Sequence, residues 1–164
     1  MQISQKIAPC LWFSKEAEDA ARYYVGIFPN SKIGKIARYG KEGFEKHQQP
    51  AGTVLTVQFE LAGQSFTALN GGPVFKFNEA VSLQVYVDDQ KELDHYWNRL
   101  TAGGDPDSQF CGWLKDKYGL SWQVVPRKMV EWFGEPNAKS EHVMKALMQM
   151  RKLDIAALEK AYNG

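Results

Sequence analysis

The 164-residue chain has little cysteine, no long apolar run and almost no net charge. Its two cysteines, Cys10 and Cys111, can form one disulfide at most, which excludes a disulfide-stabilised scaffold and predicts two free thiols. No apolar stretch approaches the roughly 20 residues of a membrane helix, and the first residues lack the apolar core of a signal peptide. A net charge of +1 without a basic run argues against nucleic-acid binding. We therefore expect a cytoplasmic protein with no membrane and no nucleic-acid partner.

The first half of the chain is expected to run strand, helix and three further strands. Ser14 is the expected cap of a helix in which alanines and Tyr24 recur at helical spacing. Residues 53–61 alternate apolar and polar side chains, which is typical of a strand with one buried face. A polar stretch over 40–52 predicts a loop. The expected strands are 7–13, 32–39, 53–61 and 64–69, and the expected helix is 15–28.

The second half repeats this order of elements. After the turn signal Asn70-Gly71-Gly72-Pro73, residues 81–87 alternate as a strand, and Asp89 with Glu92 resembles a capping box for a helix that Gly103-Gly104 ends. Residues 108–115 and 120–125 predict a hairpin. The remainder is expected to be helical, with caps at Ser140 and Asp154. This pattern predicts a first module over 1–74, a second over 75–128 and a helical C-terminal tail over 129–164.

Several short segments resemble the PhnB-like branch of the vicinal oxygen chelate superfamily, which includes glyoxalase I, extradiol dioxygenases and bleomycin resistance proteins. They are Leu11-Trp12-Phe13, residues 17–24, Phe28-Pro29-Asn30-Ser31, residues 69–73, residues 111–116, residues 119–126 and residues 152–155. The resemblance implies an α+β fold of two βαβββ modules that form a curled eight-stranded sheet around a cavity. It also implies a homodimer and a small-molecule ligand.

This branch often carries the label 3-demethylubiquinone 3-methyltransferase. A methyltransferase of the usual kind holds S-adenosylmethionine on a glycine-rich turn between a parallel strand and a helix. Gly71-Gly72 is followed by Pro73 and a segment without helical periodicity, and no other part of the chain offers such a unit. The sequence therefore argues against methyl transfer.

The resemblance implies that the superfamily's enzymes hold a divalent metal with four side chains, typically His and Glu, one from the first strand and one from the last strand of each module. Each of these positions can be checked here. The resemblance places Gln123, Thr67 and Ser82 at three of them, and the fourth falls near residues 8–10. None of these is a strong ligand. His47, His95 and His142 fall in a polar loop and on expected helices, as surface residues. We therefore expect a metal-free protein, or one that binds metal weakly and adventitiously, and no cofactor.

One face of each expected strand is polar, and these faces are the expected lining of the cavity. Trp113, which shares its parity with Cys111 and Lys115, is the expected aromatic wall, and Asn70 is expected to close the mouth. A wet groove or a dimer contact remains the alternative interpretation of this face. The expected cavity residues are Cys10, Trp12, Gln58, Thr67, Asn70, Ser82, Gln84, Tyr86, Trp113 and Gln123.

Three functions follow from these observations. The first is a metal-free small-molecule-binding protein, which the missing ligands favour. The second is a metal-dependent lyase or dioxygenase-like enzyme with a noncanonical metal site. The third is an interaction module that acts through its tail and dimer surface. No catalytic constellation can be named, because Cys111 has no neighbouring base and nothing brings Glu60 to Asp116, so whether a reaction is catalysed stays open.

Overall fold

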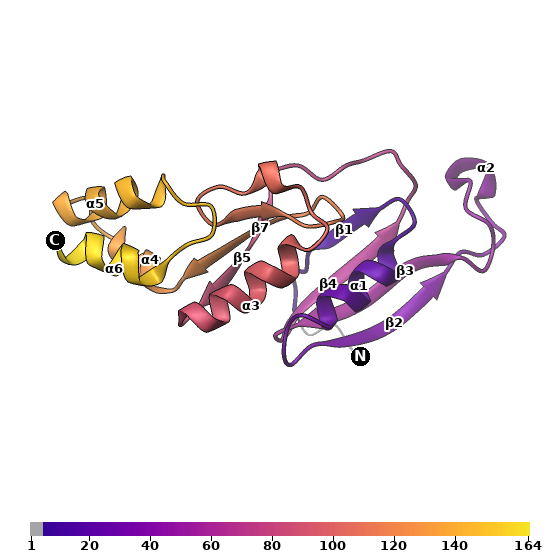
Figure 1. Cartoon of the computed structure of the whole chain (residues 1–164). Coiled ribbons are helices and arrows are strands. Elements are labelled where there is room, and N and C mark those ends of the chain that lie inside the picture. The colour runs from indigo at the N-terminus through magenta and orange to yellow at the C-terminus, as the bar shows by residue number, and fades with distance from the viewer. Residues whose placement is uncertain (1–4) are drawn as a thin grey trace. The chain divides into compact units, whose positions relative to one another are not determined.

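The chain divides after Lys76 into two units, and the computed structural model describes residues 5–164 (Figure 1). Unit 1 ends at Lys76, and unit 2 runs from Phe77 to Gly164 and includes the C-terminal tail. The sequence placed its first boundary after residue 74. Each unit combines one small sheet with helices, which confirms the α+β class.

Unit 1 builds a four-stranded sheet on one principal helix. Its elements are β1 (Cys10–Phe13), α1 (Ala17–Val25), β2 (Lys32–Arg38), α2 (Phe44–His47), β3 (Val54–Leu61) and β4 (Gln64–Asn70). The strand order is β1-β4-β3-β2, in which β1 runs parallel to β4 and the other neighbours are antiparallel. The four predicted strands are present, although β1 is shorter than 7–13. The loop predicted over 40–52 contains the single turn of α2.

Helix α1 packs on one face of this sheet through small side chains. The alanines on its inner side are fully buried, so the helix backbone can approach the strands closely. Tyr24 adds a larger ring, which stacks on Phe59 with centroids 6.4 Å apart. Phe59 in turn stacks on Phe66 at 5.3 Å. The apolar side chains of β3 and β4 therefore pack against α1. The side chains on the opposite face of these strands do not contact this helix.

The start of α1 is held by a residue from a distant strand. The Asn70 side chain accepts a hydrogen bond from the Ala17 N–H at 2.8 Å and donates one to the Val54 carbonyl at 3.1 Å. The predicted cap at Ser14 is therefore wrong, since the helix begins at Ala17 and no side chain next to it in sequence caps it. Asn70 supplies the acceptor that an N-terminal helical N–H needs.

The turn after β4 closes over Trp12. The Trp12 indole N–H donates to the Gly72 carbonyl at 2.9 Å, and its ring meets Phe75 edge-on with centroids 4.9 Å apart. A Cβ at Gly71 would lie 2.0 Å from the indole ring. Glycine is needed at this position because the tryptophan occupies the space that any side chain would fill.

Unit 2 has a three-stranded sheet, one covering helix and the tail. Its elements are β5 (Ser82–Val87), α3 (Gln90–Thr101), η1 (Pro106–Ser108), β6 (Trp113–Lys115), β7 (Ser121–Pro126), α4 (Lys128–Trp132), α5 (Ala138–Leu147) and α6 (Ile155–Asn163). The strand order is β5-β7-β6, with β5 parallel and β6 antiparallel to β7. Asp89 caps α3 by accepting from the Glu92 N–H at 2.8 Å, which confirms the predicted capping residue.

Residues 5–164 form the seven strands that the residue pattern predicts, and not the eight that the family resemblance implies. The segment predicted as a strand over 108–115 starts with the short helix η1, and only Trp113–Lys115 extends along β7. Pro106 lies in that helix, and Cys111 and Gly112 have positive φ angles of 52° and 83°. These residues turn the backbone away from a β conformation, so the strand starts late.

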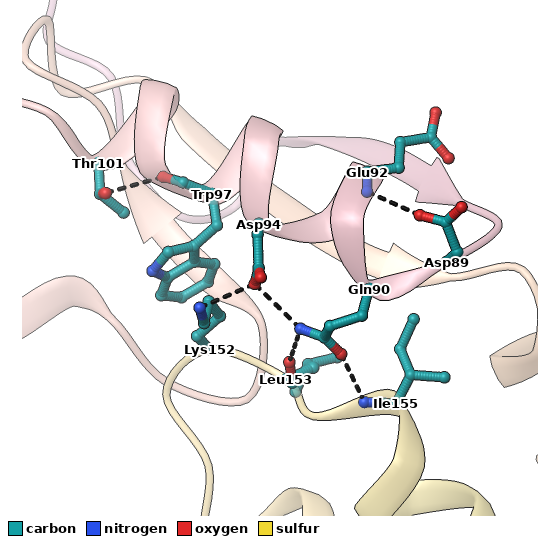
Figure 2. Close-up of polar contacts among 9 residues, drawn as sticks. All are labelled: Asp89, Gln90, Glu92, Asp94, Trp97, Thr101, Lys152, Leu153 and Ile155. Atoms are coloured by element: carbon teal, nitrogen blue, oxygen red, sulfur yellow. Dashed lines mark hydrogen bonds and ion pairs between the residues drawn. The ribbon is translucent and has the colours of Figure 1, made fainter.

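The tail is bound to the α3 helix by a polar cluster (Figure 2). Gln90 donates to the Leu153 carbonyl at 3.1 Å and accepts from the Ile155 N–H at 2.9 Å. Asp94 accepts from Gln90 at 3.0 Å and pairs with Lys152 at 2.8 Å. Leu153 itself is fully buried. One glutamine side chain thus satisfies two backbone groups where the tail passes α3.

Of the two predicted caps of the longer tail helices, one is confirmed and the other is wrong. Asp154 caps α6 by accepting from the Ala157 N–H, as predicted. Ser140 is not the cap of α5: Asn137 is, and Ser140 completes a capping box from the third helical position. The box satisfies two backbone groups reciprocally, so the serine contributes from inside the helix. No helix within residues 5–164 has the length and apolar character to cross a membrane.

Replacing Gly71 with alanine is expected to destabilise the protein, because the new methyl group overlaps the Trp12 ring. Overpacking of this kind costs about 1–3 kcal/mol. Thermal unfolding and tryptophan fluorescence measure the effect, and Gly40→Ala is the control because a Cβ there meets nothing within 4 Å. Equal melting temperatures for the two variants would contradict the packing of Trp12 described above.

Candidate ligand-binding site

The unit 2 sheet has one apolar and one polar face. The apolar face packs toward α3 and includes Val85, Leu114, Trp122 and Val124, all of them buried. We call the opposite side the unit 2 open face. It consists of Ser82, Gln84, Tyr86, Trp113, Lys115, Ser121, Gln123 and the buried Val125, which the strand register places side by side.

Four side chains of the unit 2 open face form a hydrogen-bonded row, which we call the amide ladder. The Tyr86 hydroxyl donates to Gln84 Oε1 at 2.9 Å, and Gln84 Nε2 donates to Gln123 Oε1 at 3.4 Å. Gln123 Nε2 then donates to the Ser82 hydroxyl at 2.8 Å. The bonds point in one direction and polarise one another. The row holds the two amide groups in place while leaving donors and acceptors available to a ligand.

Strand β6 places an aromatic and a charged side chain next to the ladder. Trp113 lies directly opposite Gln123 in the register and is half-buried. Lys115 lies opposite Ser121, and its ammonium pairs with the Glu79 carboxylate. The Lys115 ammonium, hydrogen-bonded to Glu79, lowers the pKa of that carboxyl below its ordinary value. The Glu79 carboxyl is therefore ionised at neutral pH.

Ser121 is the unusual residue of this face. It is 1% exposed, and its hydroxyl oxygen is the buried side-chain polar atom without a hydrogen-bond partner in the described part of the chain. Most buried polar groups are satisfied, so such an exception calls for an explanation. Its neighbours across the sheet are Ser82 and Lys115.

The polar face of unit 1 carries the remaining predicted residues. Cys10, Thr67 and Gln58 lie in one row across β1, β4 and β3, all of them exposed or half-buried. Trp12 shares this face, but its indole N–H is already bonded to the turn at Gly72. Asn70 is 6% exposed, and both ends of its amide are bonded to backbone. Its observed contacts are structural.

Unit 1 also has a hollow of about 350 Å³ beside the first turn of α1. Lys15, Asp19 and Gln49 line it together with Asn70. Lys15 and Asp19 are exposed and of opposite sign, and both ends of the buried Asn70 amide are already bonded to backbone groups of the fold. The unit 2 open face offers more unsatisfied, ordered polar groups and an aromatic wall, so it is the stronger candidate site.

The residues at the family's metal positions do not fit a divalent cation. Gln123 directs its amide nitrogen, a donor, at the Ser82 hydroxyl. Within residues 5–164 there is no group of three His, Cys, Asp or Glu side chains placed to hold a metal ion. Divalent metals in proteins are bound by anionic oxygen, imidazole or thiolate ligands. This donor set instead suits hydrogen bonding to an organic ligand.

The histidines are not members of the amide ladder. His95 and His142 are exposed on α3 and α5. His47 is half-buried and organises its own loop, contacting the Glu42 carbonyl at 3.1 Å and accepting from the Gln49 N–H at 3.0 Å. Its ring also packs on Tyr39 with centroids 4.5 Å apart.

Sequence reasoning placed Cys111 on the same face as Trp113, and this is wrong. The positive φ angle of Cys111 breaks the strand alternation, and its thiol contacts the Leu147 carbonyl at 3.4 Å and the Met148 sulfur at 3.8 Å. The expected set of cavity residues also left out two members of this face. Lys115 and Ser121 share the correct parity, but only the structure shows that Glu79 pairs with the first and that the second is buried.

Comparisons with known proteins cover most of the chain. A family model described as 3-demethylubiquinone-9 3-methyltransferase matches residues 5–125. The chain is similar to the PhnB protein from Bacillus cereus, at 35% identity over 74% of this chain and 99% of that chain, with a TM-score of 0.62. No curated protein matches the sequence.

Two more distant structures share the fold. Protein PA1353 from Pseudomonas aeruginosa is 19% identical over 75% of this chain and 98% of that chain, with a TM-score of 0.55. The fosfomycin resistance protein FosX from Mesorhizobium loti is 13% identical over 82% of this chain and all of that chain (100%), also with a TM-score of 0.55.

Both thiols are expected to react slowly at neutral pH. Surrounding atoms desolvate the two sulfurs, which raises the pKa of Cys10 and of Cys111. The thiolate is the reactive form, so alkylation by iodoacetamide should keep accelerating above about pH 8.5, the ordinary thiol value. Cys10→Ser and Cys111→Ser separate the two rates, and glutathione measured in parallel is the control. A rate that levels off below that pH would show that the thiols are activated.

Proposed function

The chain belongs to the 3-demethylubiquinone-9 3-methyltransferase (PhnB-like) family of the vicinal oxygen chelate superfamily, and on that premise we propose that it binds a small organic molecule on the unit 2 open face. The amide ladder is the observation that carries the proposal. Three side chains from β5 and one from β7 are aligned by hydrogen bonds before any ligand arrives. Binding then requires little ordering of side chains, which favours affinity.

The chemistry of the face suggests how a ligand is recognised. Trp113 offers an apolar ring for a flat or aliphatic part of the ligand, and the neighbouring amides offer both donors and acceptors. Ligand sites commonly combine an aromatic wall with a few fixed polar groups. The expected lining by Cys10, Gln58 and Thr67 from unit 1 stays a prediction, and so does the expected curling of the sheet around one cavity. Homodimer formation and a cytoplasmic location also stay predictions.

Methyl transfer is not part of the proposal, despite the description of the family. The Gly71-Gly72 pair follows β4, but Pro73 and a non-helical segment come next, and Gly71 is packed against Trp12. A phosphate- or nucleotide-binding turn needs its glycines free and a helix directly behind them. The glycine pair has a packing role here.

A metal-dependent reaction is also not proposed, because the donor set at Ser82 and Gln123 is neutral and internally bonded. The proposed site works through hydrogen bonds and apolar contact. Recognition by neutral amides selects ligands by the pattern of their donors and acceptors, since an unmatched polar group is left unpaired on binding.

The site is tested by screening a library of small polar fragments against the isotope-labelled full chain by NMR. We expect hits that shift the side-chain NH2 signals of Gln84 and Gln123 and the indole signal of Trp113. Trp113→Ala should weaken these hits about tenfold or more, because it removes the apolar wall. Phe44→Ala, at an exposed aromatic residue of unit 1, is the matched control. Hits confined to other surfaces, or unchanged affinity for Trp113→Ala, would overturn the proposal.

Metal independence has its own test. Adding manganese, zinc, nickel or ferrous iron to the purified chain should leave its melting temperature unchanged. A metal bound by the native state at a hundred times its Kd would stabilise it by about 2.7 kcal/mol, a readily detected effect. The double variant Ser82→His/Gln123→Glu places stronger ligands at adjoining positions and is expected to gain a metal-dependent rise. A rise in the unmodified chain would instead support the metal-dependent lyase or dioxygenase-like alternative.

A further inference from the structure

We propose that Lys115 and Ser121 form a carboxylate-binding point on the unit 2 open face, and that Glu79 occupies it as an intramolecular placeholder which the ligand displaces. The inference rests on the proposed function and deepens it, since it assigns the ligand a chemical class: a small molecule carrying a carboxylate. Three observations on this face support it, and they concern charge, register and burial.

The first observation concerns charge. Among the strand residues of unit 2, all of which lie in the described part of the chain, Lys115 is the one charged residue. Its side chain is 26% exposed, so a large part of the lysine is out of water. Its ammonium is the cationic group on a face whose other side chains are neutral, and an anion is the partner that matches it.

The second observation concerns the partner and its position. Glu79 precedes β5 by three residues, in a segment that Asn78 turns by accepting the Ala80 N–H at 3.0 Å. Strands β5 and β6 lie on opposite sides of β7, so the contact between Glu79 and Lys115 spans β7. Lys115, Ser121 and Ser82 form one row across the sheet. The register therefore puts Lys115, which carries the ion pair, level with Ser121.

The third observation is the unsatisfied Ser121 hydroxyl. It lies on the same face as Lys115, it is 1% exposed, and it has no hydrogen-bond partner. The Glu79 carboxylate satisfies the ammonium and not this hydroxyl. A carboxylate has about four lone-pair sites, so one placed slightly deeper can accept from both groups. Such a ligand gains a hydrogen bond that the placeholder does not make.

Glu79 has the properties of an occupant that is easily displaced. Its side chain is 62% exposed, and partly exposed ion pairs contribute little to stability. Displacing it therefore removes little free energy from the fold. A ligand that also stacks on Trp113 and bonds to Gln123 makes contacts that Glu79 does not make, because both residues adjoin this row. These contacts favour the ligand over Glu79.

The test titrates the full chain with malonate and with malonamide, which has the same skeleton but neutral amides in place of the carboxylates. NMR shifts of Lys115 and Ser121 report binding. Malonate is expected to bind and malonamide to bind at least tenfold more weakly. Equal binding of the two probes, or binding of inorganic phosphate without malonate, would overturn the carboxylate assignment.

Three variants test the individual roles. Glu79→Gln should tighten malonate binding about two- to fivefold, because it removes the placeholder charge. Lys115→Met should weaken it about tenfold or more. The control is the ion pair of the tail, so Glu159→Gln should leave the affinity unchanged. If Lys115→Met fails to fold, Glu79→Gln still tests the inference. An unchanged or weaker affinity of Glu79→Gln for malonate would refute the claim that Glu79 occupies the carboxylate point.

Ser121→Ala distinguishes a ligand-binding role of this serine from a structural one. It removes a buried unsatisfied hydroxyl, so it should raise the melting temperature of the free protein while weakening malonate binding. A lower melting temperature with unchanged affinity would overturn its role. If neutral fragments still shift Gln84, Gln123 and Trp113 while malonate shifts nothing, this inference fails and the proposed function stands. If no probe shifts any of these residues, the proposed function fails as well.

Discussion

The alternation of side chains along a β-strand is the constraint on which the account depends. Each strand must direct one set of residues toward a helix and the other set away from it. In unit 1 the apolar set meets the alanines of α1, and in unit 2 it meets α3. The pairing register is then fixed, because a slip of one residue would expose the core. The polar set of unit 2 is consequently held in fixed rows, and the amide ladder and the Lys115 ion pair follow from those rows.

Much of this was predictable from the sequence, since alternation is a local pattern. The polar parity of β5 and β7 was assigned correctly, and so were the capping residues Asp89 and Asp154. The misses depend on contacts between distant segments. Asn70 caps α1 from 53 positions away, and no local motif encodes that. Cys111 left its expected face because its positive φ angle ends the alternation, and a cysteine gives no sequence signal of such a turn. Glu79 was missed because its partner lies on β6, across β7 from the β5 side of the sheet.

The chemistry of the site departs from what the superfamily resemblance implies for metal enzymes. A donor set of serine and glutamine, bonded to each other, suits hydrogen bonding to an organic molecule better than coordination. Family membership therefore carries the fold, while the function has to be argued from the site. The C-terminal tail likewise has to be described from the structure and not from family membership. It lies beyond the family match at residue 125, yet it is fastened to α3 through Gln90 and Asp94 (Figure 2).

The most direct test of the central claim is a crystal structure of the full chain soaked with a library of small polar fragments. The account predicts ordered fragments on the unit 2 open face, in contact with Trp113 and with the amide of Gln84 or Gln123. Fragments that occupy only the hollow beside α1 in unit 1, or no part of either polar face, would contradict it.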